Sequence, residues 1–380
     1  MKKLFSFLCG ILYFIFNSCA TDKALIEVIP VEDQNATVYY CNDETSFTLN
    51  GLLLYGENSF GISSGGQSAG QNISGSTASF FTFPLGRYDK SFALLPSISF
   101  EGKYLIKTAD QFKWIQIRFN RDVDINIVDL ISKDETNLTV TIPGLEYSAE
   151  KYQIPWSRKA DVFFAMKSDS IYKFFPDLTA ELLLTTKYLY DFSVSPSENY
   201  TLVFADDSLF LYDLKNNTKE SIFEVGRVLG LNPKYVRAIN WLEDDSKFTF
   251  AIGWTVYIYN LSEGIISEYD LGDKVFDVMW INDTSFLCVT GDYPPDLAHI
   301  KFVPYYKILK VSLLDGSSEV IHKKLNHEPF KIKPRLSPSK KLFVFSERPT
   351  NGPYKVKLMS LDGKNEKVIA EGFLPFWGPK

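Results

Sequence analysis

The chain has 380 residues, a formal net charge of −6 and 15% aromatic residues, including 21 Tyr and 31 Phe. It contains no basic domain and no run of Lys or Arg, so we expect no nucleic-acid partner. Four Cys residues are too few for a disulfide scaffold, whereas the many aromatic and β-branched residues favour strands.

The first segment, MKKLFSFLCGILYFIFNSCA, predicts a signal peptide over residues 1–18. Two lysines precede the apolar run Leu4–Phe16, which is too short to span a bilayer comfortably. The ending NSC at Cys19 resembles the lipobox of bacterial lipoproteins. This resemblance implies that the Cys19 thiol carries the lipid, detectable as bound palmitate, and Ala20 after it implies the outer membrane. The alternative is an ordinary secretory signal with a chance cysteine.

Residues 19–44 are predicted to be the lipidated N-terminus and a tether, and residues 45–380 a single all-β domain. Besides Cys19 and a cysteine inside the signal peptide, the chain has only Cys41 and Cys288. Nothing in the sequence places these two together. We therefore expect two separate buried thiols, with a disulfide as the alternative.

A degenerate repeat runs through the domain and is clearest in VSPSENYTLVF at Val194 and LSPSKKLFVF at Leu336. In these two repeats the residue two places before PS is called the anchor, and the equivalent residue of every other repeat has the same name. The seven anchors are Ile98, Trp156, Val194, Trp241, Trp280, Leu336 and Trp377. They lie 38 to 58 residues apart, the length of a four-stranded propeller blade.

Each repeat predicts four short strands, A to D. In the Val194 unit these are Phe192–Ser195, Tyr200–Ala205, Leu209–Leu214 and Glu220–Val225. The C–D turns carry Asn or Gly, in KNNT, SEG and two DG pairs, which predicts positive φ there.

The repeat wording resembles that of TolB-like and WD40-like propellers of the PD40 type, whose usual form is W-S-P-D-G-K-x-I-A-F. Gly102 keeps the glycine of that form, and most other units lose it. The resemblance implies a fold and no residue-specific function. We predict an all-β, seven-bladed β-propeller, with six or eight blades as alternatives.

The last repeat, FLPFWGPK, contains only a strand A. Its partners are predicted near the N-terminus, with strand B at Gly51, strand C at Ser79 and strand D at Lys90. The C-terminal strand would then close the ring, which removes exposed sheet edges.

The longest predicted loops all join strands B and C and fall on neighbouring blades. They are Asn58–Ala78, Ala109–Asp122, Gly291–Tyr305 and Glu347–Pro353. Long loops clustered on one face indicate a binding surface, although loop drift without function is the alternative. The aromatic candidates for this face are Phe60, Phe112, Trp114, Tyr293, Phe302 and Tyr305.

Two motifs for chemistry lack the structural context that they need. GGQSAG places Ser68 in the nucleophile position of an esterase elbow, but a Gly/Ser-rich loop surrounds it where a strand and a helix are required. Asp122, Asp124 and Asn126 lack the Gly and the distal Glu of a calcium loop, and their alternation favours a half-exposed strand.

His322 and His327 are predicted to be solvated in a D–A connection, with a metal pair as the alternative, so no metal and no cofactor is expected. The sequence predicts a non-catalytic, lipid-anchored module of the bacterial cell envelope that binds a protein or glycan. The alternative is a propeller enzyme, a lyase or lactonase-like hydrolase, with its site at the mouth of the central channel. The charged residues on predicted A strands that such a site would use are Asp191, Arg237, Asp277 and Arg335.

Overall fold

The computed structural model describes the chain between residues 29 and 378 with internal gaps. The described ranges are 29–33, 36–41, 49–53, 97–108, 125–129, 131–132, 134–146, 154–224, 236–292, 305–325, 332–349 and 352–378. Within these ranges, no helix is long and apolar enough to cross a membrane.

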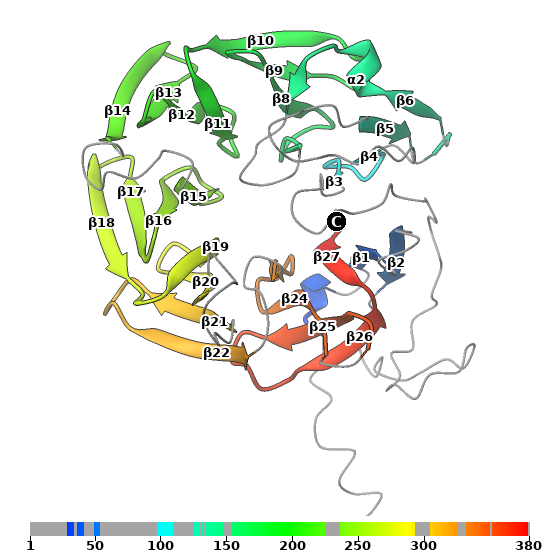
Figure 1. The fold of residues 1–380 in the computed structure, drawn as a ribbon, viewed down its shortest axis with the longest axis vertical. Coiled ribbons are helices and arrows are strands. Elements are labelled where there is room, and N and C mark those ends of the chain that lie inside the picture. The colour runs from blue at the N-terminus through cyan, green and yellow to red at the C-terminus, as the bar shows by residue number, and fades with distance from the viewer. Residues whose placement is uncertain are drawn as a thin grey trace, which may run out of the picture.

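Seven antiparallel sheets surround one axis in the described part of the chain, six with four strands and one with three (Figure 1). The first two sheets contain β3 (Ser97–Ile98), β4 (Tyr104–Thr108), β5 (Ile125–Asp129), β6 (Glu135–Asn137), and then β7 (Leu145–Glu146), β8 (Phe163–Lys167), β9 (Ser170–Phe174), β10 (Ala180–Thr185). The next two contain β11 (Leu189–Val194), β12 (Tyr200–Ala205), β13 (Ser208–Asp213), β14 (Thr218–Glu224), and then β15 (Val236–Trp241), β16 (Lys247–Ile252), β17 (Thr255–Asn260), β18 (Ile265–Asp270).

The fifth and sixth sheets contain β19 (Lys274–Asn282), β20 (Ser285–Asp292), β21 (Tyr305–Ser312), β22 (Ser318–Leu325), and then β23 (Arg335–Leu336), β24 (Leu342–Glu347), β25 (Lys355–Ser360), β26 (Lys367–Glu371). The three-stranded sheet has the order β2 (Leu49–Leu53), β1 (Thr37–Cys41), β27 (Phe373–Trp377). Two short helices, η1 (Val31–Asp33) and α2 (Leu138–Thr141), complete the described elements.

All seven predicted anchors lie at the inner edge of a sheet. Six belong to the innermost strands β3, β11, β15, β19, β23 and β27. The seventh, Trp156, forms an isolated antiparallel β-bridge with Phe163, the first residue of β8. The repeat therefore marks one strand A per sheet. The predicted all-β propeller is confirmed.

The four anchor tryptophans also link neighbouring sheets. Each indole N–H donates to a backbone carbonyl one residue before the anchor of the preceding sheet. The four bonds are Trp156 to Ser97 (3.2 Å), Trp241 to Ser193 (3.1 Å), Trp280 to Asn240 (3.2 Å) and Trp377 to Arg335 (2.9 Å). A buried indole needs such an acceptor, which explains why Trp recurs at this position.

Four A–B turns contain a left-handed residue four places after the anchor. Gly102 has φ of 72°, whereas Glu198, Asp245 and Lys340 adopt φ of 60°, 64° and 57° without the freedom of glycine. The C–D turns behave as predicted, since Asn217, Gly264, Gly316 and Gly363 all have positive φ.

At three interfaces within the described ranges, a carboxylate of the following sheet accepts a backbone N–H of the A–B turn. The bonds are Glu101 N–H to Asp161 (2.7 Å), Ser197 N–H to Asp245 (3.1 Å) and Ser339 N–H to Asp33 (2.7 Å). Asp33 belongs to η1, which precedes β1 of the three-stranded sheet. Its carboxylate therefore binds the A–B turn of the sixth sheet in the way that an A–B turn carboxylate does at the other interfaces.

The ring closes through β27, as predicted, but its strand partner was predicted wrongly. β27 pairs with β1, and Val38 lies opposite Trp377. The segment predicted as strand B lies one strand farther out, in β2, which pairs with β1. β1 falls inside the predicted tether, where polar residues flank a strand of only five residues. The predicted strands at Ser79 and Lys90 lie outside the described residues.

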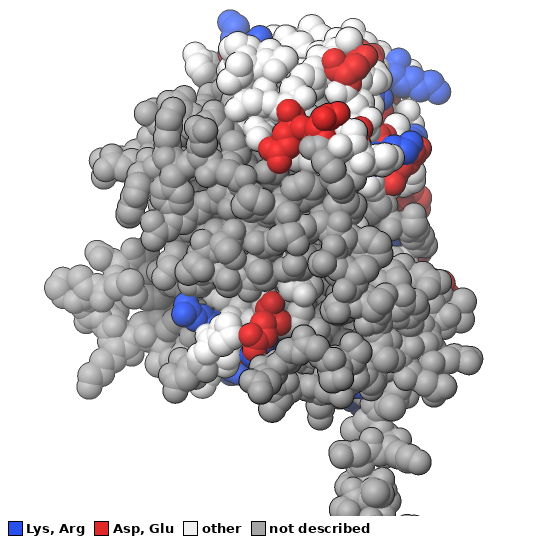
Figure 2. All heavy atoms as spheres, turned by 90° about the vertical axis from the view of Figure 1, so that its right-hand side faces the viewer, with Lys and Arg blue, Asp and Glu red and all other residues white. Residues whose placement is uncertain are grey.

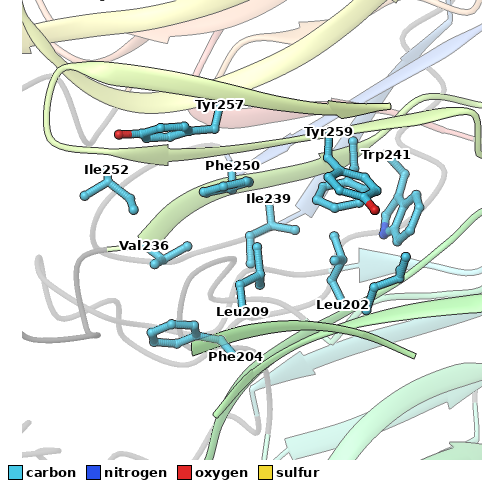
Figure 3. Packing of buried hydrophobic residues seen from close by; sticks show 12 residues of the cluster. Leu202, Phe204, Leu209, Val236, Ile239, Trp241, Phe250, Ile252, Tyr257 and Tyr259 are labelled. Atoms are coloured by element: carbon cyan, nitrogen blue, oxygen red, sulfur yellow. The ribbon is translucent and has the colours of Figure 1, made fainter. Parts of the chain in front are cut away.

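The apolar cores fill the spaces between adjacent sheets. In the cluster of Figure 3, Leu202 and Leu209 of one sheet pack against Trp241 and Phe250 of the next. Cys288 is buried in another such core and is a free thiol. Because each sheet from the second to the sixth contributes to two cores, removal of any one of these would expose apolar surface on both neighbours.

Candidate functional site

The strand order divides the turns between two faces of the propeller. B–C and D–A connections open on one face, which we call the loop face, and A–B and C–D connections on the other, which we call the turn face. Five of the six predicted aromatic candidates, Phe60, Phe112, Trp114, Tyr293 and Phe302, lie outside the described residues. Tyr305 is described, and it lies at the loop-face end of its sheet as the first residue of β21.

Tyr305 is held in a polar cluster at the loop-face end of β21. Its hydroxyl donates to Asp273 Oδ1 at 2.5 Å, and Lys307 Nζ donates to Asp273 Oδ2 at 2.6 Å. The hydrogen bond to Asp273, with burial added, raises the pKa of Tyr305 to about 12. Burial alone would raise the pKa of Asp273, but the bonds from Lys307 and Tyr305 lower it overall. The Asp273 carboxylate therefore holds the side chains of Tyr305 and Lys307 in fixed positions through charge-assisted hydrogen bonds.

Two ammonium groups surround the Tyr305 ring. Lys307 Nζ lies 5.6 Å and Lys323 Nζ 5.8 Å from the ring centroid. Cations at this distance are attracted to an aromatic face. Beside them, Lys274 and Asp292 form an ion pair of 3.8 Å.

Trp254 is an exposed aromatic residue on the same face that sequence reasoning missed. It lies in the two-residue B–C turn between β16 and β17, and 59% of its surface is exposed. The D–A segment that leads to β19 holds this turn, because Leu271 N–H donates to the Trp254 carbonyl at 3.0 Å and Val275 N–H to that of Gly253 at 2.9 Å. Asp273 lies in the same D–A segment, so Trp254 and the Tyr305 cluster are joined by a short, hydrogen-bonded stretch of chain.

Two further aromatic residues are exposed near the loop-face end of another sheet. Tyr188 precedes β11 and Tyr190 lies within it, and both side chains are exposed. Trp254, Tyr188 and Tyr190 could have been identified from the sequence as aromatic residues in or next to predicted short turns, away from the anchor positions. An exposed Trp or Tyr in a short turn has no role in the repeat, whereas the sequence interpretation weighed only loop length.

Charged residues of alternating sign lie on the innermost strands of four consecutive sheets. They are Asp191 on β11, Arg237 on β15, Asp277 on β19 and Arg335 on β23. Arg335 Nη1 donates to Asp277 Oδ2 at 3.0 Å. Asp191 and Asp277 also accept the N–H of the next residue, at 2.7 and 3.1 Å, beside irregularities in strand register. These carboxylates thus stabilise bulges of the inner strands.

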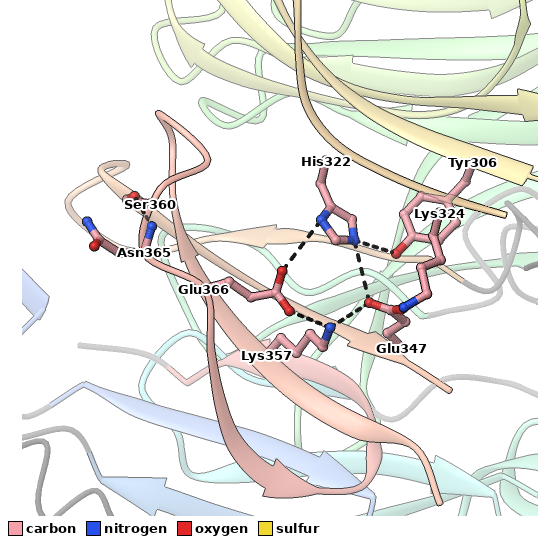
Figure 4. A network of polar contacts seen from close by, with 8 residues as sticks. All are labelled: Tyr306, His322, Lys324, Glu347, Lys357, Ser360, Asn365 and Glu366. Carbon is pink, nitrogen blue, oxygen red and sulfur yellow. Dashed lines mark hydrogen bonds and ion pairs between the residues drawn. The ribbon is translucent and has the colours of Figure 1, made fainter. Parts of the chain in front are cut away.

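A buried carboxylate, Glu347, joins the fifth and sixth sheets (Figure 4). Its side chain is 2% exposed and accepts from Lys357 Nζ at 2.7 Å and from Lys324. His322 Nε2 lies 3.4 Å from Glu347 and 3.0 Å from the Tyr306 hydroxyl. Burial alone would raise the pKa of Glu347, but the hydrogen bonds from His322, Lys324 and Lys357 hold it well below its usual range.

The prediction that His322 is solvated is therefore wrong, because its side chain is only 13% exposed within β22. His327 lies outside the described residues. In the described part of the chain, no group of three or more His, Cys, Asp or Glu residues could hold a metal ion. Asn126, once considered for a calcium loop, lies in strand β5 and donates to Glu135 at 2.9 Å, which confirms the strand interpretation there.

Acidic and basic side chains are interspersed on the side of the molecule shown in Figure 2, over its described upper part. The described part of that side therefore favours no ligand of one charge sign.

No model of a known protein family matches the chain, and no curated protein matches it. Among solved structures, it is similar to an oligogalacturonate lyase in complex with manganese, with 11% identity, a TM-score of 0.53, and coverage of 91% of this chain and 85% of that one. An oligogalacturonate lyase from Vibrio parahaemolyticus has 11% identity, a TM-score of 0.50, and coverage of 91% and 86%.

The chain has a β-propeller fold. The similar structures include TolB from Acinetobacter baumannii, with 14% identity, a TM-score of 0.46, and coverage of 93% of this chain and 68% of that one. At identities this low, the similarity shows the fold alone, and the activities of these proteins are their own.

Proposed function

We propose that this propeller is a lipid-anchored binding module of a bacterial cell envelope, which holds a protein or glycan partner on its loop face. The observation that carries the proposal is the exposed Trp254 on a hydrogen-bonded turn, next to the fixed Asp273–Tyr305–Lys307 cluster. Rigid aromatic groups with a few fixed polar neighbours are typical of interface centres, because little side-chain entropy is lost on binding.

The anchor in this proposal is the Cys19 thiol, and the outer membrane is its location. Support comes from the basic and apolar segment before Cys19 and from Ala20 after it. A protein with two or more acyl chains stays on its membrane, so the partner would be held at the envelope.

The binding site is tested by partner capture from a detergent-solubilised envelope, with the partner identified and its affinity then measured. We expect Trp254→Ala to weaken binding about thirtyfold, which corresponds to about 2 kcal/mol for an aromatic anchor, with the melting temperature unchanged. Trp114→Ala and Tyr293→Ala should act in the same direction. Lys215→Ala, on the turn face, is the matched control and should change neither quantity. Loss of binding in Lys215→Ala with full binding in Trp254→Ala would mean that the wrong face was chosen.

A second candidate function is a propeller enzyme, a lyase or lactonase-like hydrolase. The specific observation that favours it is the Asp277–Arg335 pair on the innermost strands, where Arg335 Nη1 and Asp277 Oδ2 are 3.0 Å apart. Such a site would lose turnover of an acidic sugar substrate in Arg335→Lys while partner capture stayed intact. The binding module predicts no turnover to lose.

A further inference from the structure

The N-terminal segment enters the propeller on the turn face. Asp33 binds the A–B turn of the sixth sheet through Ser339, and Glu32 lies 3.7 Å from Lys341 in the same turn. Gly378 N–H donates to the Thr37 carbonyl at 2.7 Å, where strand A of the closing sheet meets its strand B. The described chain therefore begins on the turn face, opposite Trp254.

The distance available to a lipid on Cys19 is short. Ile29, the first described residue, is buried and lies ten residues after Cys19. Ten residues span at most about 36 Å when fully extended. Strands of six residues, such as β12 and β16, make the propeller about 20 Å thick between its faces. A tether that reached the loop face would use more than half of its length along the side, which favours the turn face as the one that meets the bilayer.

Two large apolar side chains project from the turn face. Leu314 is 81% exposed in the C–D turn between β21 and β22, and Ile131 is 76% exposed in the C–D turn between β5 and β6. They are the two most exposed large hydrophobic residues of the described chain.

Carboxylates fix both turns, because Asp129 accepts the N–H of Ile131 at 2.7 Å and Asp315 accepts that of Ser317 at 3.1 Å. These bonds fix the backbone of the two turns that present Ile131 and Leu314 to solvent.

The two tips lie on widely separated sheets. Figure 1 places β5 and β6 at the upper right of the ring and β21 and β22 at the lower left. With the N-terminal segment as a third point, they define a plane across the turn face. Single exposed apolar residues are common on protein surfaces. These two lie on opposite sides of the disc, on the face where the described chain begins, and this arrangement suits contact with a flat apolar surface.

We propose that the turn face rests on the lipid bilayer, with Ile131 and Leu314 in the boundary between headgroups and acyl chains, and that the loop face points away from the membrane. This inference rests on the lipid anchor of the proposed function. It identifies the bilayer as the occupant of the turn face and leaves Trp254 and the Tyr305 cluster free for the partner.

The test uses the full lipidated chain on vesicles of phosphatidylethanolamine and phosphatidylglycerol that contain a brominated phospholipid. In a Cys41→Ala background, Leu314→Cys, Ile131→Cys and Trp254→Cys each provide one exposed thiol for a fluorescent label, since Cys288 is buried. All three sites are exposed apolar residues in turns, which makes Trp254→Cys the matched control on the loop face. We expect the labels at 314 and 131 to be quenched at least threefold more than the label at 254.

Flotation with the vesicles is measured on the same samples and separates the two hypotheses. A chain that does not float lacks the anchor, which overturns the proposed function and this inference with it. A chain that floats with equal quenching at all three sites, with more quenching at 254, or with none, retains the anchor and overturns the orientation alone.

Discussion

Replacement of Asp33 by Ala tests whether the residues before β1 belong to the closed ring. The Asp33 side chain is buried and accepts two bonds from Ser339, from its N–H at 2.7 Å and from its hydroxyl at 2.5 Å. A hydrogen bond to a charged group contributes about 1.5–3 kcal/mol, and the variant also leaves the Ser339 donors without their acceptor. We expect Asp33→Ala to lower the free energy of unfolding by about 3 kcal/mol in urea titrations of the mature protein.

The control for this experiment is the neighbouring Glu32→Ala. Glu32 and Lys341 form a solvent-exposed ion pair of 3.7 Å, so its loss should change stability by less than about 0.5 kcal/mol. A double-mutant cycle with Ser339→Ala should show a coupling energy of at least about 1 kcal/mol, because the two side chains share one bond. If Asp33→Ala matches Glu32→Ala, η1 is a bystander and the ring closes through β1 and β27 alone.

Three further changes test other parts of the ring by the same titration. Lys340→Gly should stabilise the protein by about 1 kcal/mol, because Lys340 has φ of 57° and glycine adopts this φ without strain. Asp245→Gly relieves the same strain but should destabilise the protein, because the lost hydrogen bonds of Asp245 to the preceding turn contribute more. Stability changes of the same sign in both variants would contradict this reasoning. Trp280→Phe should cost about 1–2 kcal/mol because the Asn240 carbonyl loses its indole donor, and no loss would mean that water replaces the indole. Glu347→Gln should cost about 3 kcal/mol at pH 7, and the gap to the wild type should shrink below about pH 4.

The sign of the Glu347 prediction follows from the direction of its pKa shift. The folded pKa lies below the unfolded value of about 4.3, so the unfolded chain takes up the proton first. The contribution of Glu347 to stability is therefore complete above that value and is lost as the pH falls toward the folded pKa. A gap between wild type and variant that stayed constant from pH 7 to pH 3 would contradict the proposed ionised state.

The sequence predicted those parts of the fold that depend on a regular spacing. The anchors recur because every sheet needs one inner strand and one contact with its neighbour, and four of them are Trp because an indole supplies both apolar surface and a hydrogen-bond donor. The role of the indole bond was not predictable from one chain, because its acceptor is a backbone carbonyl in the preceding repeat. Strand β1 was missed because its five residues stand alone, and its inner partner comes from the opposite end of the chain.

The candidate site was predictable only in outline. Loop length pointed to the loop face and to Tyr305, but not to Asp273, which reaches Tyr305 from a D–A connection in another part of the sequence. His322 was placed with His327 in a solvated D–A connection, because a His among polar residues gives no sign of a buried neighbour. Its burial comes from the sixth sheet, where Glu347 ends β24.

The distribution of structural bonds between the two faces bears on the proposed function. The bonds that close the ring near the termini, from Ser339 to Asp33 and from Gly378 to Thr37, lie on the turn face. The bonds of Trp254 and Tyr305 on the loop face join only elements close to them. These loop-face bonds take no part in closing the ring, so a partner that binds Trp254 and Tyr305 leaves the closure intact. The first described residues also enter on the turn face, so with the proposed anchor on Cys19 a force on the lipid would reach the ring near these closing bonds.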